Sequence, residues 1–165
     1  MLFRSISILD PIALTNRLAG GSRHDLDYSF STLAIEPTKP SAPTILIVDD
    51  AALMRRRFEA SLTIAGFITH TCNDGLEALN WLQTNASPDL MITDVEMPNM
   101  DGFTLIDRAR QAKITIPILV VSSRLSEEWG KEARRLGATD YLNKGFSTPE
   151  LIAKVNLLLG LLVKI

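Results

Sequence analysis

The sequence predicts an α/β fold, a doubly wound parallel sheet of five strands alternating with five helices, preceded by a short N-terminal extension. Short apolar runs typical of buried strands alternate with stretches of helical periodicity from residue 45 onward. Most of the apolar runs are followed by a polar residue with a carboxylate, hydroxyl or amino group, which can bind a ligand or take part in a reaction. Such residues are expected beyond the carboxyl ends of the strands in a doubly wound sheet, so one edge of the sheet is the candidate site.

Length and composition exclude several classes of protein. The 165 residues suit one domain and an appendage, and hydrophobic residues make up 46% of them, enough for a real core. The formal net charge of -2 gives no electrostatic reason to expect a nucleic-acid partner. The single cysteine, Cys72, cannot form an internal disulfide, which indicates a reducing, cytoplasmic location. No apolar run reaches the roughly 20 residues that span a bilayer, so no membrane association is predicted.

An N-terminal extension precedes the regular pattern. Residues 1–20 are interpreted as a short strand and a helix, with Asp10-Pro11 as the helix start. So short a piece cannot bury a core alone, and we interpret it as the remnant of a preceding domain. Residues 21–44 are interpreted as a linker, because closely spaced prolines prevent a helix and remove the donors of a strand ladder.

The first strand and helix follow the linker. Residues 45–48 form an unbroken apolar run, typical of a strand that is covered on both faces. Helical spacing then places Met54, Phe58 and Leu62 on one face. Gly66 is well placed to end this helix, because glycine readily adopts the left-handed conformation found there.

The alternation then repeats four times. Further strands are predicted at 68–72, 90–93, 118–121 and 141–143. Further helices are predicted at 75–83, 103–110, 127–136 and 149–162. In the helix at 75–83, Leu76, Leu79 and Leu82 are expected to share one side. Ser147 stands three residues before Glu150, a spacing that predicts a capping box at the start of the last helix.

Polar side chains follow four of these strands. Asp49 and Asp50 follow the first strand, Asp94 the third, Ser122 the fourth and Lys144 the fifth. Three carboxylates near one point repel one another unless a cation compensates their charge. A hard divalent cation such as Mg²⁺ takes oxygen ligands, and together with a lysine it suits a transferring phosphoryl group. A carboxylate can be the nucleophile that accepts this group.

These motifs resemble the receiver domain of bacterial response regulators, a CheY-like, flavodoxin-like (βα)5 family. The resemblance rests on ILIVDD at 45–50, DVEMPNMDG at 94–102, Ser122 and YLNK at 141–144, and it covers about 45–162. It implies a receiver domain over 45–162 that takes a phosphoryl group from a histidine kinase or a phosphotransfer protein. The pathway would be two-component signal transduction of the chemotaxis or motility type, and the output would pass to an unknown partner protein.

The resemblance implies a role in phosphotransfer for each matching residue. Asp94 matches the phosphoacceptor. Asp49 and Asp50 match the acidic pair that holds Mg²⁺, with the Asp94 carboxylate and the backbone carbonyl of Glu96 completing the protein ligands. Lys144 matches the lysine that contacts the phosphoryl group. Such a domain assists its own phosphotransfer and dephosphorylation but is not a turnover enzyme.

The resemblance also implies a switch and a control of access. Ser122 matches a hydroxyl that both contacts the phosphoryl group and takes part in the switch, and Tyr141 matches the aromatic switch residue. Glu96 and Arg124 match the positions that flank the path of the attacking water. Their opposite charges should attract, and the pair is expected to form a partial lid over the site.

One departure from the family pattern concerns the residue after Lys144. The family usually has a proline there in a cis peptide, whereas this chain has Gly145. A cis bond before a non-proline residue costs ~2.5–4 kcal/mol, so we predict a trans bond between Lys144 and Gly145. The run Arg55-Arg56-Arg57 on the first helix is interpreted as a solvated helix face.

Alternative functions remain open. One is a phosphorylation-independent interaction module, and a less favoured one is an aspartate-based phosphatase. Residues 6–14 resemble the end of a CheW-like domain. This second resemblance implies that the chain is part of a hybrid chemotaxis-type histidine kinase.

Overall fold

The structure, a computed structural model, describes residues 41–124 and 126–161. The predicted remnant at 1–20 and most of the predicted linker at 21–44 lie outside the described residues. The first strand begins at Thr44, one residue before the predicted start of the domain.

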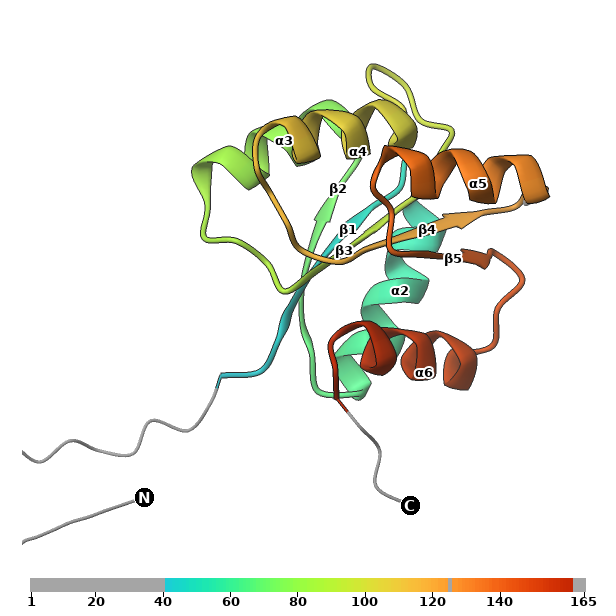
Figure 1. The fold of residues 1–165 in the computed structure, drawn as a ribbon. Helices are drawn as coiled ribbons and strands as arrows, with labels where there is room; N and C mark the ends of the chain where they lie inside the picture. Colours follow the sequence, from blue (N-terminus) through green and yellow to red (C-terminus); the bar gives the residue numbers. More distant parts are fainter. Residues whose placement is uncertain (1–40, 125, 162–165) are drawn as a thin grey trace, which may run out of the picture. The chain divides into compact units, whose positions relative to one another are not determined.

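A five-stranded parallel sheet forms the centre of the domain (Figure 1). Its strands are β1 (Thr44–Val48), β2 (Ile68–Cys72), β3 (Leu90–Thr93), β4 (Ile118–Ser122) and β5 (Asp140–Asn143). Their order across the sheet is β2-β1-β3-β4-β5, which confirms the predicted doubly wound topology. Because all five strands are parallel, their carboxyl ends lie at one edge, where such sheets place their sites.

Five helices cover the two faces of this sheet. They are α2 (Ala52–Ile64), α3 (Gly75–Thr84), α4 (Gly102–Gln111), α5 (Glu127–Leu136) and α6 (Thr148–Leu158). Helices α3, α4 and α5 pack on one face, and α2 and α6 pack on the other (Figure 1). None of these described helices is long and apolar enough to cross a membrane.

The unbroken apolar runs of the sequence follow from this two-sided cover. On β1, Leu46 and Val48 point into the core beneath α3, α4 and α5, while Ile45 and Ile47 point into the core beneath α2 and α6. All four side chains are at most 1% exposed. A strand buried on both faces needs apolar residues at every position, which is why no alternation is visible in its sequence.

Local signals place the helix ends. The predicted capping box is present, because Ser147 Oγ accepts the amide of Glu150 and the Glu150 carboxylate accepts the amide of Ser147. Gly66 follows α2 with φ +96° and Gly137 follows α5 with φ +119°, a conformation that favours glycine. Gly160 has φ +73° and stops α6 at Leu158, so the predicted helix end at residue 162 was four residues too late.

The predicted face of α3 was partly wrong. Leu82 is buried and Leu79 packs against the same core, but Leu76 is 47% exposed. Ala78 instead completes the buried side of this helix. Leucine spacing alone misplaced the face because the small alanine, which allows close packing on the sheet, carries little weight in a hydrophobic pattern.

Candidate functional site

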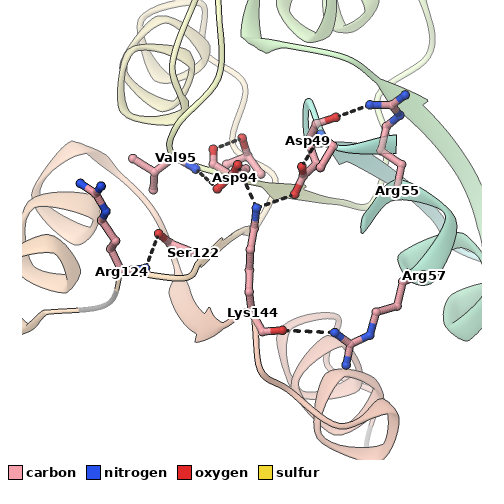
Figure 2. Close-up of polar contacts among 10 residues, drawn as sticks. Asp49, Arg55, Arg57, Asp94, Val95, Ser122, Arg124 and Lys144 are labelled. Atoms are coloured by element: carbon pink, nitrogen blue, oxygen red, sulfur yellow. Dashed lines mark hydrogen bonds and ion pairs between the residues drawn. The ribbon is translucent and has the colours of Figure 1, made fainter. Parts of the chain in front are cut away.

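The predicted polar residues meet at the carboxyl edge of the sheet. Lys144 Nζ lies 3.0 Å from Asp94 Oδ2 and 3.1 Å from Asp49 Oδ2 (Figure 2). Asp49 and Asp94 are buried, whereas Asp50 is exposed beside them. Three strands, β1, β3 and β5, therefore deliver two buried carboxylates and one lysine to a single point.

The backbone at the end of β3 fixes the Asp94 side chain. The amide of Asp94 donates to the carbonyl of Val48 at 2.9 Å, which extends the ladder between β3 and β1. Asp94 Oδ1 accepts the amide of Val95 at 2.7 Å (Figure 2). One carboxylate oxygen is thus held by the backbone, while the other faces Lys144.

A glycine closes the loop that follows Asp94. The amide of Gly102 donates to the carbonyl of Val95 at 2.8 Å, so the loop returns to its own start. A Cβ at Gly102 would lie 2.0 Å from the carbonyl oxygen of Asp94, so no side chain fits there. Sequence reasoning did not find this packing role, because only the closed loop brings these residues together.

Burial and charge act against each other on the titratable groups. Burial raises the pKa of Asp94 above its ordinary value, although the hydrogen bond and the charge of Lys144 act in the opposite direction. Burial lowers the pKa of Lys144, but its contacts with Asp94 and Asp49 outweigh burial and leave that pKa raised. The lysine therefore stays charged, and Asp94 needs nearby positive charge to stay ionised.

The three aspartates fit a hard divalent cation. Each offers one carboxylate oxygen, and these atoms lie within 4.8 Å of one another. Asp49 Oδ1 accepts the amide of Ala51, but Asp49 Oδ2 is buried and has no well-directed hydrogen bond among the described residues, despite the nearby lysine. A buried carboxylate oxygen left in this way is stabilised by a cation, and oxygen ligands of this kind suit Mg²⁺.

The predicted switch residues lie on neighbouring strands at the same face of the sheet. Ser122 ends β4 and is buried, and its Oγ accepts the amide of Arg124 at 3.1 Å. Tyr141 pairs in register with Val120, which shares a sheet face with Ser122 because side chains alternate along a strand. Both side chains therefore face the layer of α3, α4 and α5.

The expected ion pair at the mouth of the site is present. Arg124 Nη1 lies 3.2 Å from Glu96 Oε2, and the two side chains are 71% and 50% exposed. An exposed pair of this kind contributes ~0–1 kcal/mol to stability. Its expected effect is therefore on access to the site and not on the stability of the fold.

The interpretation of the arginine run as a solvated helix face holds in part: Arg56 and Arg57 are exposed and Arg55 is half-buried, but Arg55 and Arg57 also donate to backbone carbonyls. Arg55 Nη1 donates to the carbonyl of Asp49 at 2.6 Å. Arg57 donates to the carbonyl of Lys144 (Figure 2) and to that of Phe146. Its guanidinium lies 4.2 Å from the centre of the Phe146 ring. Helix α2 therefore holds the two loops that carry Asp49 and Lys144.

The loop after β5 has the predicted trans bond between Lys144 and Gly145, since no cis peptide bond occurs in the described residues. Asn143 Oδ1 accepts the amide of Gly145 at 2.7 Å and so shapes the turn. Phe146 then enters the core, where its ring stacks on Phe58 at 5.2 Å between centroids. Side-chain anchors on both sides thus keep Lys144 aimed at the acidic residues.

Arg57→Ala is expected to destabilise this loop. Two carbonyls would lose a charged donor and Phe146 would lose its cation partner, so the free energy of unfolding should fall by about 1–2 kcal/mol. Urea unfolding measures this as a lower midpoint at unchanged slope. The matched control is Arg56→Ala, since Arg56 is exposed and makes no hydrogen bond or ion pair among the described residues. Equal midpoints for the two variants would contradict the anchoring role.

The fold and the site together define a class of protein. A doubly wound five-stranded sheet that brings an acidic pair, a third aspartate and a lysine to its carboxyl edge is the architecture of a receiver domain. The family model described as "Response regulator receiver domain" matches residues 45–156. The chain belongs to this family, and it contains a receiver domain of the kind found in the response regulators of two-component systems.

Known proteins agree with this membership. The chain is 33% identical over 143 residues to the alkaline phosphatase synthesis transcriptional regulatory protein SphR of Synechococcus elongatus, covering 81% of the chain and 56% of SphR. It is 36% identical over 122 residues to the transcriptional regulatory protein PrrA of Mycobacterium leprae, covering 74% of the chain and 52% of PrrA. The chain thus spans about half the length of these relatives.

Solved structures show the same fold. The receiver domain of the Francisella response regulator 1452 is 34% identical, with a TM-score of 0.68, and the match covers 72% of this chain and 97% of that one. The chemotaxis protein CheY4 of Vibrio cholerae is 32% identical, with a TM-score of 0.67, and the match covers 71% and 98%. These two receivers correspond to the described domain almost over their whole length.

Proposed function

We propose that this chain is a phosphorylation-dependent signalling receiver that accepts a phosphoryl group on Asp94. The observation that carries the proposal is the position of Lys144 Nζ, 3.0 Å from Asp94 Oδ2 and 3.1 Å from Asp49 Oδ2, at the carboxyl edge of the sheet. The donor would be a phosphohistidine of a histidine kinase or a phosphotransfer protein. Membership of the receiver family supports a phosphohistidine donor of this kind.

The proposed transfer forms one bond and breaks one. A carboxylate oxygen of Asp94 bonds to phosphorus while the nitrogen–phosphorus bond of the donor breaks, and the imidazole nitrogen keeps the electron pair and takes a proton. Lys144 would exchange its contact with the carboxylate for one with a phosphoryl oxygen, and the Ser122 hydroxyl would donate to a phosphoryl oxygen. Asp49, Asp50, Asp94 and the backbone carbonyl of Glu96 would hold Mg²⁺. When bound, this ion neutralises charge that develops on the phosphoryl oxygens.

The signal would follow from a change in equilibrium between two conformations. An acyl phosphate on Asp94 adds charge beside Ser122 and favours the state in which the hydroxyl contacts a phosphoryl oxygen. Tyr141, on the same face of the neighbouring strand, would change its position with Ser122. The surface around Tyr141 would then present the change to an output partner.

The stoichiometry of labelling tests this function. The protein is incubated with Mg²⁺ and acetyl phosphate, and its intact mass is measured. The expected result is one added phosphoryl group per chain. Steady hydrolysis of a generic phosphate ester such as p-nitrophenyl phosphate, without a labelled protein, would support the phosphatase alternative. The absence of both would support the interaction module that works without phosphorylation.

The proposed pathway is two-component signalling of the chemotaxis or motility type. Its support is the resemblance of residues 6–14 to the end of a CheW-like domain, which also favours membership of a hybrid histidine kinase. SphR and PrrA are transcriptional regulatory proteins, and the chain matches only about half of each. For this chain, the net charge of -2 supports a protein output partner rather than direct contact with nucleic acid.

Arg124→Ala is expected to shorten the lifetime of the phosphoryl group. The ion pair with Glu96 would restrict access to Asp94, and its loss would free the Glu96 carboxylate to position water. Decay should accelerate by about two- to five-fold, the range that an exposed pair of at most about 1 kcal/mol allows. The loss of label is followed by mass after the donor is removed.

A second exposed ion pair provides the control for this experiment. Lys131 Nζ lies 2.8 Å from Glu127 Oε1 on α5, with both side chains more than 70% exposed, so Lys131→Ala removes a similar pair that does not include the residues at the mouth of the site. Its decay rate should equal that of the parent protein. If phosphorylated Arg124→Ala decays at the parent rate or more slowly, the lid is excluded.

A further inference from the structure

The ring of Tyr141 occupies a place on α5 that a side chain would otherwise fill. Gly130 lies inside this helix and is buried. A Cβ at Gly130 would lie 2.9 Å from Cε1 and 3.2 Å from Cζ of the tyrosine ring. Glycine inside a helix is less favourable than alanine, so its presence here has a cost that packing of the ring offsets. Gly130 therefore forms a notch into which the ring of Tyr141 fits.

An arginine one turn further along α5 lies against the same ring. The guanidinium carbon of Arg134 is 4.9 Å from the centroid of the Tyr141 ring, within the distance of a cation–π contact. Gly130 and Arg134 are four residues apart and so lie on one side of the helix. The notch and the arginine together form what we call the tyrosine seat.

A charge network holds this arginine in place. Arg134 Nη2 lies 3.3 Å from Asp140 Oδ1, and the other carboxylate oxygen of Asp140 lies 2.8 Å from Lys154 Nζ on α6. Asp140 Oδ1 also accepts the amide of Tyr141 at 2.8 Å. Asp140 therefore connects the backbone of Tyr141 to the arginine over its ring, and a lysine on a second helix orients Asp140.

The contacts of the seat occur together with two contacts at the carboxyl edge of the sheet. In the same arrangement Lys144 Nζ lies 3.0 Å from Oδ2 of Asp94. Ser122 Oγ meanwhile accepts the amide of Arg124. An interaction that is made in only one of two conformations shifts the equilibrium toward that conformation by its own free energy.

We propose that Gly130 and Arg134 hold the Tyr141 ring against α5 in the resting receiver, and that Arg134 thereby sets how readily the protein enters its phosphorylated conformation. This inference rests on the proposed function, since it requires Tyr141 to move when Asp94 is modified. Arg134 is a positioning residue that acts through the ring. The next residue, Arg135, makes two hydrogen bonds to Glu132 at 2.7 and 2.8 Å, and the cation–π contact with the ring is made by Arg134 instead.

The test compares Arg134→Ala with Arg135→Ala as the matched control. Beryllofluoride with Mg²⁺ serves as a phosphoryl mimic, and its apparent affinity is measured from the change in tryptophan fluorescence. Trp129 precedes Gly130 on α5, and a Trp81→Phe background removes the signal of the other tryptophan. Arg134→Ala should bind the mimic about two- to five-fold more tightly, the change that loss of an exposed cation–π contact allows. Arg135→Ala should bind it as the parent does. Urea unfolding of both variants confirms that each remains folded.

A second background shows whether the arginine acts through the ring. In Tyr141→Ala, the additional change Arg134→Ala should leave the affinity unaltered, because the group on which the arginine acts is gone. Unchanged affinity of Arg134→Ala in the parent background would overturn the proposal, and so would an equal gain with and without the ring. If the parent protein binds the mimic and accepts label while Arg134→Ala matches it, only the seat is excluded. If the parent neither binds nor accepts label, the proposed function fails and the seat fails with it.

Discussion

Asp94→Asn is expected to abolish labelling by acetyl phosphate. The amide oxygen is a far weaker nucleophile than a carboxylate. Asp49 is the other buried carboxylate that contacts Lys144, and it is assigned to the metal site rather than to the acceptor. The substitution preserves size and can still accept the amide of Val95, so the loop after β3 should keep its shape. The variant should therefore remain folded, and its intact mass should show no added phosphoryl group.

An aspartate away from the candidate site provides the control for this variant. Asp107 lies on α4 and accepts a hydrogen bond from the side chain of Gln111, so Asp107→Asn removes one carboxylate that does not contact the lysine. It should be labelled to the same extent as the parent protein. Labelling of Asp94→Asn that matches the parent would show that a different residue is the acceptor and would refute the assignment of Asp94.

Removal of the metal site is expected to have the second largest effect. Asp50→Ala, or chelation of Mg²⁺ in the parent protein, should slow labelling by about a hundred-fold or more, because a metal ion contributes several kcal/mol to the stabilisation of a transferring phosphoryl group. Asp50 is the better target than Asp49, since Asp50 is exposed whereas Asp49 is buried against Lys144. Loss of Asp49 would remove one of the two carboxylates that pair with Lys144. A fall in labelling would then not distinguish a destabilised fold from the loss of a metal ligand.

Thermal unfolding separates metal binding from any damage to the fold. A ligand that binds only the folded state raises the melting temperature, so Mg²⁺ should stabilise the parent protein. Without Mg²⁺, Asp50→Ala should melt at or above the temperature of the parent, because it removes one of three clustered negative charges. Adding Mg²⁺ should then change it little. Labelling that is insensitive both to chelation and to Asp50→Ala would show that the aspartates do not hold a metal needed for the reaction.

The class of fold and the members of the candidate site could be predicted from the sequence. Residues 45–48 and 118–121 are unbroken apolar runs because β1 and β4 are buried on both faces, and that property is visible without coordinates. Asp49, Asp94 and Lys144 could be grouped because the carboxyl ends of parallel strands must meet at one edge. Both inferences depend on short-range patterns and on a rule of topology, and neither requires side-chain positions.

Side-chain contacts between distant segments were decided only by the tertiary structure. Arg55, Arg56 and Arg57 are identical in type and adjacent in sequence, yet Arg57 donates to carbonyls 87 and 89 residues away while Arg56 makes no hydrogen bond within the described part of the chain. From the sequence alone, Gly130 is only an unfavourable residue inside a helix, and the structure shows that the ring of Tyr141 packs against it. Local spacing determines which side of an element a residue occupies, but its partner is set by the packing of whole elements, because a contact depends on positions that no single stretch of sequence contains.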